Sequence, residues 1–75
     1  MGLTPRELTV LALLADALTA SQIGRRLGIS TRTVNKHVEN MFRKMGTSDR
    51  LAAVLQARAA GILAPLPHEH TARLR

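Results

Sequence analysis

Hydrophobic positions recur at helical spacing along most of the chain and divide it into four segments. In each segment the apolar residues return every three or four positions, which places them on one face of an α-helix. No segment carries the pattern of a strand. We therefore predict an all-α fold with four helices, at about residues 5–16, 20–27, 31–45 and 49–60.

The ends of these segments carry residues that start and stop helices. Thr4 and Glu7 have the spacing of a capping box, and Pro5 suits the first helical position. Ser30 is a good N-cap for the third helix. The last three helices are each followed by a glycine, a residue that readily adopts the left-handed conformation of helix ends: Gly28, Gly46 and Gly61.

The residues that end helices also divide the chain into a domain and a tail. We expect one domain over residues 1–63 and a disordered tail over residues 64–75, where Pro65 and Pro67 interrupt any helix. Arg50, at the start of the fourth helix, could pair with Asp49 or Glu7 or contact a phosphate. We favour the structural pairing. The expected core is Val10, Leu11, Leu14, Ala17 and Leu18 from the first helix, Ile23 and Leu27 from the second, and Ala53, Val54 and Ala57 from the fourth.

The second and third segments form a helix-turn-helix unit. Two helices joined by a short turn with a glycine, here Gly28, are typical of this unit. The pair is too small to bury its apolar faces alone, so the first and fourth helices must supply the rest of the core.

The helix predicted at 31–45 has two contrasting faces. Its apolar stripe spans about 100°, the width expected of a buried face. Asparagine, lysine and glutamate on the opposite face can pair with adenine, guanine and cytosine, and terminal basic or hydroxyl groups suit phosphates. We therefore favour a DNA-recognition face over a merely solvated one. The stripe comprises Val34, Val38, Met41, Phe42 and Met45; the polar face comprises Arg32, Asn35, Lys36, Glu39 and Arg43, flanked by Thr33 and Lys44.

Composition narrows the choice of function. Phe42 is the one aromatic residue among 75, which argues against stacking on single-stranded bases. The chain has no cysteine and no catalytic constellation, so we expect neither an enzyme nor a bound metal or cofactor; the histidines of residues 68–70 lie in the predicted tail. No apolar run approaches the roughly 20 residues that span a bilayer, and no signal peptide is visible, so a cytoplasmic protein is expected.

The positive charge is concentrated in the middle of the chain. Seven basic and two acidic residues lie between Arg25 and Arg50, so this third holds most of the net charge of +6. A basic cluster on a small domain is typical of a polyanion partner. Charge alone does not distinguish this interpretation from a basic solvated surface.

The chain resembles the C-terminal DNA-binding domain of LuxR-type (GerE-like) transcription regulators. The resemblance covers about residues 3–63 and rests on the segments 3–7, 13–15, 23–30, 33–38, 42–46 and 49–50. It implies a four-helix fold and binding of double-stranded DNA as the output domain of a transcription regulator, with the third helix in the major groove. By position, it implies base contacts from Asn35, Lys36 and Glu39, and backbone contacts from Arg32, Thr33, His37 and Lys44; Arg43 joins the backbone set through its place on the helix. Ser21 stands where the family often has a basic residue, and Glu39 where some members have one.

The fourth helix has a second apolar side that suits a contact between two copies. The family commonly dimerises through this helix, so a homodimer on DNA is implied, and RNA polymerase is a further candidate partner. A stable dimer of this chain without DNA is not expected, since the side chains are small. The predicted dimer contact comprises Leu51, Ala52, Leu55 and Ala59.

Two alternative functions stay open at this point. A promoter-reading module of a sigma subunit shares the helix-turn-helix unit, although Gly46, the segment 49–50 and a fourth helix favour the LuxR type. A protein-interaction bundle without DNA binding could use Leu8 and the fourth helix.

Overall fold

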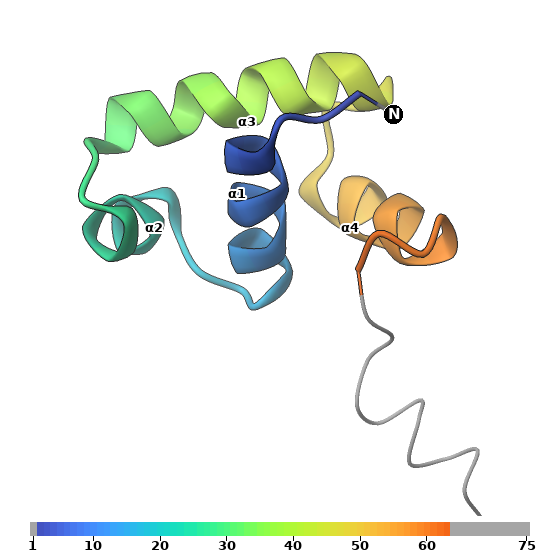
Figure 1. Cartoon of the computed structure of the whole chain (residues 1–75), viewed down its shortest axis with the longest axis horizontal. Coiled ribbons are helices and arrows are strands. Elements are labelled where there is room, and N and C mark those ends of the chain that lie inside the picture. Colours follow the sequence, from blue (N-terminus) through green and yellow to red (C-terminus); the bar gives the residue numbers. More distant parts are fainter. Residues whose placement is uncertain (1, 64–75) are drawn as a thin grey trace, which may run out of the picture.

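The computed structural model describes residues 2–63, which form four helices joined by short turns (Figure 1). The predicted all-α class is confirmed, and the helix ends agree with the prediction to within one residue. The predicted tail at 64–75 lies outside the described residues. The helices are α1 (Pro5–Ala15), α2 (Ala20–Leu27), α3 (Thr31–Met45) and α4 (Arg50–Ala59).

The longest helix, α3, lies along one edge of the molecule, and the other three helices lie on one side of it (Figure 1). Its N-terminal half lies next to α2, and α1 points towards its middle. The helix α4 lies on the same side, below the C-terminal end of α3, and packs against α1. One long face of α3 is therefore left outside the bundle. Within residues 2–63, no helix is long and apolar enough to cross a bilayer.

The predicted caps start the helices. The hydroxyl of Thr4 accepts from the backbone N–H of Glu7 at 3.1 Å, and the carboxylate of Glu7 accepts from the backbone N–H of Thr4 at 2.8 Å. Ser30 caps α3 as predicted, accepting from the N–H of Thr33 at 3.0 Å. A second capping box, between Thr19 and Gln22, was not predicted, although threonine followed by glutamine three residues later is its sequence pattern.

All four helices end on a residue in the left-handed conformation, but α1 uses alanine for it. The three predicted glycines have φ between 71° and 72° at α2 and α3 and 76° at α4, whereas Ala17 has φ 66°. The N–H of Leu18 donates to the carbonyl of Leu13 at 3.2 Å, and Ala17 to that of Leu14 at 3.0 Å, a Schellman motif. Ala17 is therefore exposed, and the prediction that it joins the core is wrong because the helix ends before it.

The core otherwise lies where the helical periodicity predicted, except that Leu18 and Leu27 are only half-buried at its edge. Val10, Leu11, Ile23, Val34 and Met41 are fully buried. The predicted edge of the α3 stripe is less covered, since Val38 and Phe42 are half-buried. The remaining buried apolar side chains are Leu14, Met45, Ala53, Val54 and Ala57.

Polar contacts attach α4 to the ends of two other helices. The guanidinium of Arg50 donates to the carbonyls of Leu14 and Leu18 at 2.6 and 2.9 Å, at the C-terminus of α1. The amide of Gln56 donates to the carbonyl of Met45, the last residue of α3, at 3.1 Å. Carbonyls at helix ends lack the partner that a longer helix would supply, so these side chains add hydrogen bonds there. The structural role predicted for Arg50 is observed, but its partners are carbonyls and not a carboxylate.

Candidate nucleic-acid interface

The polar face of α3 is exposed, as its helical phase predicted. Asn35, Lys36 and Glu39 are all exposed, while Val34 and Met41 on the opposite side are fully buried. Arg32 and Arg43, towards the two ends of the helix, are also exposed on this face. A narrow apolar stripe fixes the rotation of a helix about its axis, so burial of the stripe presents these five polar side chains to solvent.

The three predicted base-reading residues share one surface depression. Asn35, Lys36 and Glu39 line it together with Arg32 and Thr33. Within residues 2–63, no hydrogen bond or ion pair engages the side chains of Asn35, Lys36 or Glu39. Their donors and acceptors are therefore available to a ligand that lies along α3.

The N-terminus of α3 suits an anion. Arg32 and Thr33 lie in its first turn, where backbone N–H groups and the helix dipole favour negative charge. The hydroxyls of Ser30 and Thr33 are 2.9 Å apart and hydrogen-bonded, which orients the Thr33 side chain. His37, one turn further on, is half-buried. The structure thus brings Arg32 and Thr33 next to the predicted base-reading side chains.

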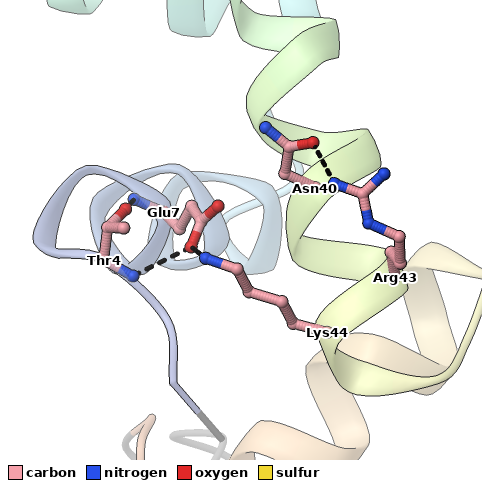
Figure 2. A network of polar contacts seen from close by, with 5 residues as sticks. All are labelled: Thr4, Glu7, Asn40, Arg43 and Lys44. Atoms are coloured by element: carbon pink, nitrogen blue, oxygen red, sulfur yellow. Dashed lines mark hydrogen bonds and ion pairs between the residues drawn. The ribbon is translucent and has the colours of Figure 1, made fainter.

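Arg43 is oriented by its own helix. Its guanidinium donates to the side-chain oxygen of Asn40 at 2.6 Å (Figure 2). A guanidinium has five N–H donors, so this bond leaves others for a second acceptor such as a phosphate oxygen. The exposed side chain of Arg43 therefore keeps the capacity that the sequence predicted.

Lys44 differs from the other predicted backbone-contact residues, because its ammonium is bound to a buried carboxylate of α1, although its side chain stays 35 % exposed. Its Nζ lies 2.7 Å from Oε1 of Glu7, the same oxygen that accepts from the backbone N–H of Thr4 (Figure 2). Glu7 is only 3 % exposed. The hydrogen bond from Lys44 and the backbone bond from Thr4 lower the pKa of Glu7, against the opposing effect of burial. Glu7 is thus the structural, capping carboxylate that the sequence predicted, with an unpredicted partner.

The outer apolar face of α4, defined as Leu51, Ala52, Leu55 and Ala59, is largely uncovered. Leu51 is 64 % exposed and Leu55 is 51 % exposed, whereas Ala52 is half-buried. The two leucines line a groove with the C-terminal end of α1. In the described part of the chain, no three histidine, aspartate or glutamate residues come together as a metal site would require.

Comparison with known proteins places this geometry in a family. The model of bacterial regulatory proteins of the luxR family matches residues 1–57, which include all of α1, α2 and α3. The chain belongs to the LuxR family. The resemblance seen in the sequence is therefore confirmed, and with it the interpretation as a DNA-binding domain of transcription regulation.

Relatives of this domain are transcription regulators. The transcriptional activator SolR of Ralstonia solanacearum is 43 % identical over 61 residues, covering 81 % of this chain and 26 % of SolR. The nitrate/nitrite response regulator NarL of Escherichia coli is 43 % identical over 53 residues, covering 71 % of this chain and 24 % of NarL.

The fold of this LuxR-family chain matches a solved response regulator. The crystal structure of ChrA, from a heme-sensing two-component system, superposes with a TM-score of 0.79 at 32 % identity, covering 84 % of this chain and 31 % of ChrA. The chain spans about a quarter of the length of SolR and NarL.

Proposed function

We propose that this domain binds double-stranded DNA sequence-specifically, as the output domain of a transcription regulator, with α3 in the major groove. The observation that supports this proposal is the exposed polar face of α3, whose central side chains have no partner within residues 2–63. The major groove of B-DNA, about 12 Å wide, admits one α-helix. The second helix of a helix-turn-helix unit is the one that enters it. A cytoplasmic location follows from this role in a bacterial cell.

Base reading is assigned to Asn35, Lys36 and Glu39. The amide of Asn35 can pair with both N6 and N7 of adenine, and the ammonium of Lys36 can donate to O6 or N7 of guanine. The carboxylate of Glu39 accepts from the N4 amino group of cytosine and repels phosphates, so it favours one base and penalises misplaced binding. Their common depression on α3 supports this assignment.

Contacts with the DNA backbone are assigned to Arg32, Thr33, His37 and Arg43. Two of them lie in the first turn of α3 and one in its last turn, so they would meet phosphates on both sides of the groove. Such contacts supply much of the affinity and fix the register of the helix without reading sequence. Lys44, also predicted to belong to this set, is bound to Glu7 in the free domain.

Two copies of the domain are proposed to meet on DNA through the outer apolar face of α4. The exposure of Leu51 and Leu55 supports this contact. A two-fold pair would read half-sites about one DNA turn apart. Two leucines and two alanines bury less than the roughly 800 Å² per partner of a stable interface, so the free domain should be monomeric. Sedimentation at micromolar concentration, with and without the duplex, would measure this. RNA polymerase is a further proposed partner of the whole regulator, in keeping with relatives named transcriptional activators.

Selection of bound sequences from a random duplex pool, followed by a salt titration, tests the proposed function. We expect one enriched half-site, and log K that falls linearly with log salt at a slope of about −0.9 per phosphate contacted. A protein-interaction bundle would give no enriched sequence and no salt-dependent duplex binding. That result would contradict the proposal.

A further inference from the structure

We propose that Lys44 is a positioning residue for the recognition helix and not a phosphate contact: its ion pair with Glu7 fixes how α3 sits on α1. The inference rests on the proposed DNA-binding function. In this proposal the ion pair contributes to sequence discrimination, because it holds the base-reading side chains in register with the bases.

A buried carboxylate fixes the position of the cation that neutralises it. Glu7 is 3 % exposed, and its Oε1 accepts from both the Thr4 N–H at 2.8 Å and the Lys44 ammonium at 2.7 Å. A charge removed from water must be paired and hydrogen-bonded to remain charged. The last turn of α3, which carries Lys44, is therefore held at a defined distance from the first turn of α1.

The Lys44–Glu7 ion pair is a directional contact between α1 and α3. Among the described residues, no other hydrogen bond or ion pair joins a side chain of α1 to a side chain of α3. The remaining contact between α1 and α3 is apolar packing within the shared core. Apolar burial is non-directional, so it tolerates small rotations that a charged hydrogen bond resists.

A small change in the orientation of α3 at Lys44 produces a larger displacement towards the base-reading end of the helix. Asn35 lies nine residues before Lys44, a distance of about 13 Å along the helix at 1.5 Å per residue. A rotation of about 5° at Lys44 would move the backbone of Asn35 by about 1 Å, and recognition groups must be held within about 0.5 Å. Loss of the pair should therefore weaken specific binding more than binding to random duplex.

The Lys44 side chain is 35 % exposed, but a phosphate that drew its ammonium away would have to break this pair, which already neutralises it. Leaving Glu7 buried without its cation costs more than one solvent-screened phosphate contact returns. Arg43, its neighbour, differs from Lys44, since it is exposed and its partner Asn40 lies on the same helix. Arg43 is therefore the matched phosphate-contact control for Lys44.

The test measures DNA binding by Glu7→Gln, which keeps the capping box because glutamine also accepts from the N-cap N–H. Asp16→Asn is the control, since it changes net charge identically at an exposed position at the end of α1. Affinity for the selected site and for random duplex is measured at several salt concentrations, at a temperature where circular dichroism shows each variant fully folded. Lys44→Met and Arg43→Met are measured alongside.

We expect Glu7→Gln to lower affinity for the selected site about tenfold, the cost of roughly one mismatched base pair, with random-duplex affinity and salt slope unchanged. Lys44→Met should lose the same preference and leave the salt slope within about 0.3 of the parent, whereas Arg43→Met should reduce the slope by about 1. Asp16→Asn should bind like the parent. These results would support the positioning role.

Two other results would overturn the inference. If Glu7→Gln bound both duplexes more tightly with a steeper salt slope, Lys44 would be a phosphate contact held back by Glu7. If Glu7→Gln melted at a lower temperature but kept the full preference for the selected site, the pair would only stabilise the fold. Failure of the proposed function itself is distinguishable, because the parent domain would then show no preferred site.

Discussion

Lys36 and Asn35 lie side by side in sequence on the exposed face of α3, and neither is engaged by other described residues. Their exposure could be predicted from sequence, because one buried stripe sets the direction of every side chain on the helix. The sequence places Lys44 on the flank of α3 but does not indicate its partner. Glu7 lies 37 residues away, and that proximity depends on how α1 crosses α3.

Lys36→Ala tests the reading face at the scale of one side chain. If Lys36 pairs with a base, the variant should bind the selected site about 1–3 kcal/mol more weakly and random duplex nearly as well as the parent. Arg43→Ala is the control, since loss of a phosphate contact should weaken both duplexes alike. Equal losses on both duplexes for Lys36→Ala, measured by fluorescence anisotropy, would make Lys36 a phosphate contact.

Ala17 is the second residue whose environment the sequence did not reveal. An alanine with φ 66° is uncommon, because its Cβ crowds the following carbonyl at a cost of about 1–2 kcal/mol. Ala17→Gly should remove that strain and make the unfolded chain more flexible, for a net gain of about 0.5–1 kcal/mol in the free energy of unfolding.

Thermal unfolding measures this gain as a rise of about 2–8 °C in Tm. The matched control is Ala12→Gly in the interior of α1, where glycine should lower stability by about 1 kcal/mol. If Ala17→Gly also lowered Tm, the left-handed conformation at the end of α1 would be wrong.

At the scale of elements, the starts and stops of helices were the most predictable feature. Thr4, Ser30, Gly28 and Gly46 mark their ends through local hydrogen bonds and backbone conformation, which depend on a few neighbouring residues. The close approach of α2 to the turn before α3 was not predicted. It occurs at Gly24, where an added Cβ would lie 2.7 Å from the carbonyl oxygen of Ile29.

Gly24→Ala separates helix propensity from packing. Propensity alone favours alanine by about 1 kcal/mol, but the clash is with backbone and cannot be relieved by turning a side chain. We expect a net loss of about 1–3 kcal/mol in the free energy of unfolding by urea, because α2 must shift relative to the turn. Ser21→Ala, on the exposed side of α2, is the control and should be neutral or slightly stabilising. A stabilised Gly24→Ala would show that the turn has room for the methyl group.

At the scale of the whole molecule, long-range polar contacts set how the helices sit together. Arg50 and Gln56 bind carbonyls at the ends of α1 and α3, and Glu7 joins α1 to α3. The fold class and most of the apolar core could be predicted from sequence, since both follow from helical periodicity. These polar contacts could not, because a carbonyl acceptor has no signature in the sequence and becomes available only when helix ends meet.

The Glu7 contact should make stability depend on pH in a defined direction. The folded domain lowers the pKa of Glu7, so the contribution is complete above the pKa of the unfolded chain, about 4.3, and is lost as pH falls through the lower folded value. The difference in free energy of unfolding between the parent and Glu7→Gln should therefore be constant above about pH 5.5 and shrink on acidification. Thermal unfolding at a series of pH values measures it, and a difference that grew towards low pH would contradict this role.

Methylation interference on the selected duplex tests most directly whether α3 lies in the major groove. Guanine N7 is exposed in the major groove and adenine N3 in the minor groove, so methyl groups at the two atoms probe different faces of the same base pairs. The account predicts that N7 methylation within each half-site abolishes binding while N3 methylation there has no effect. Interference confined to adenine N3 would contradict it.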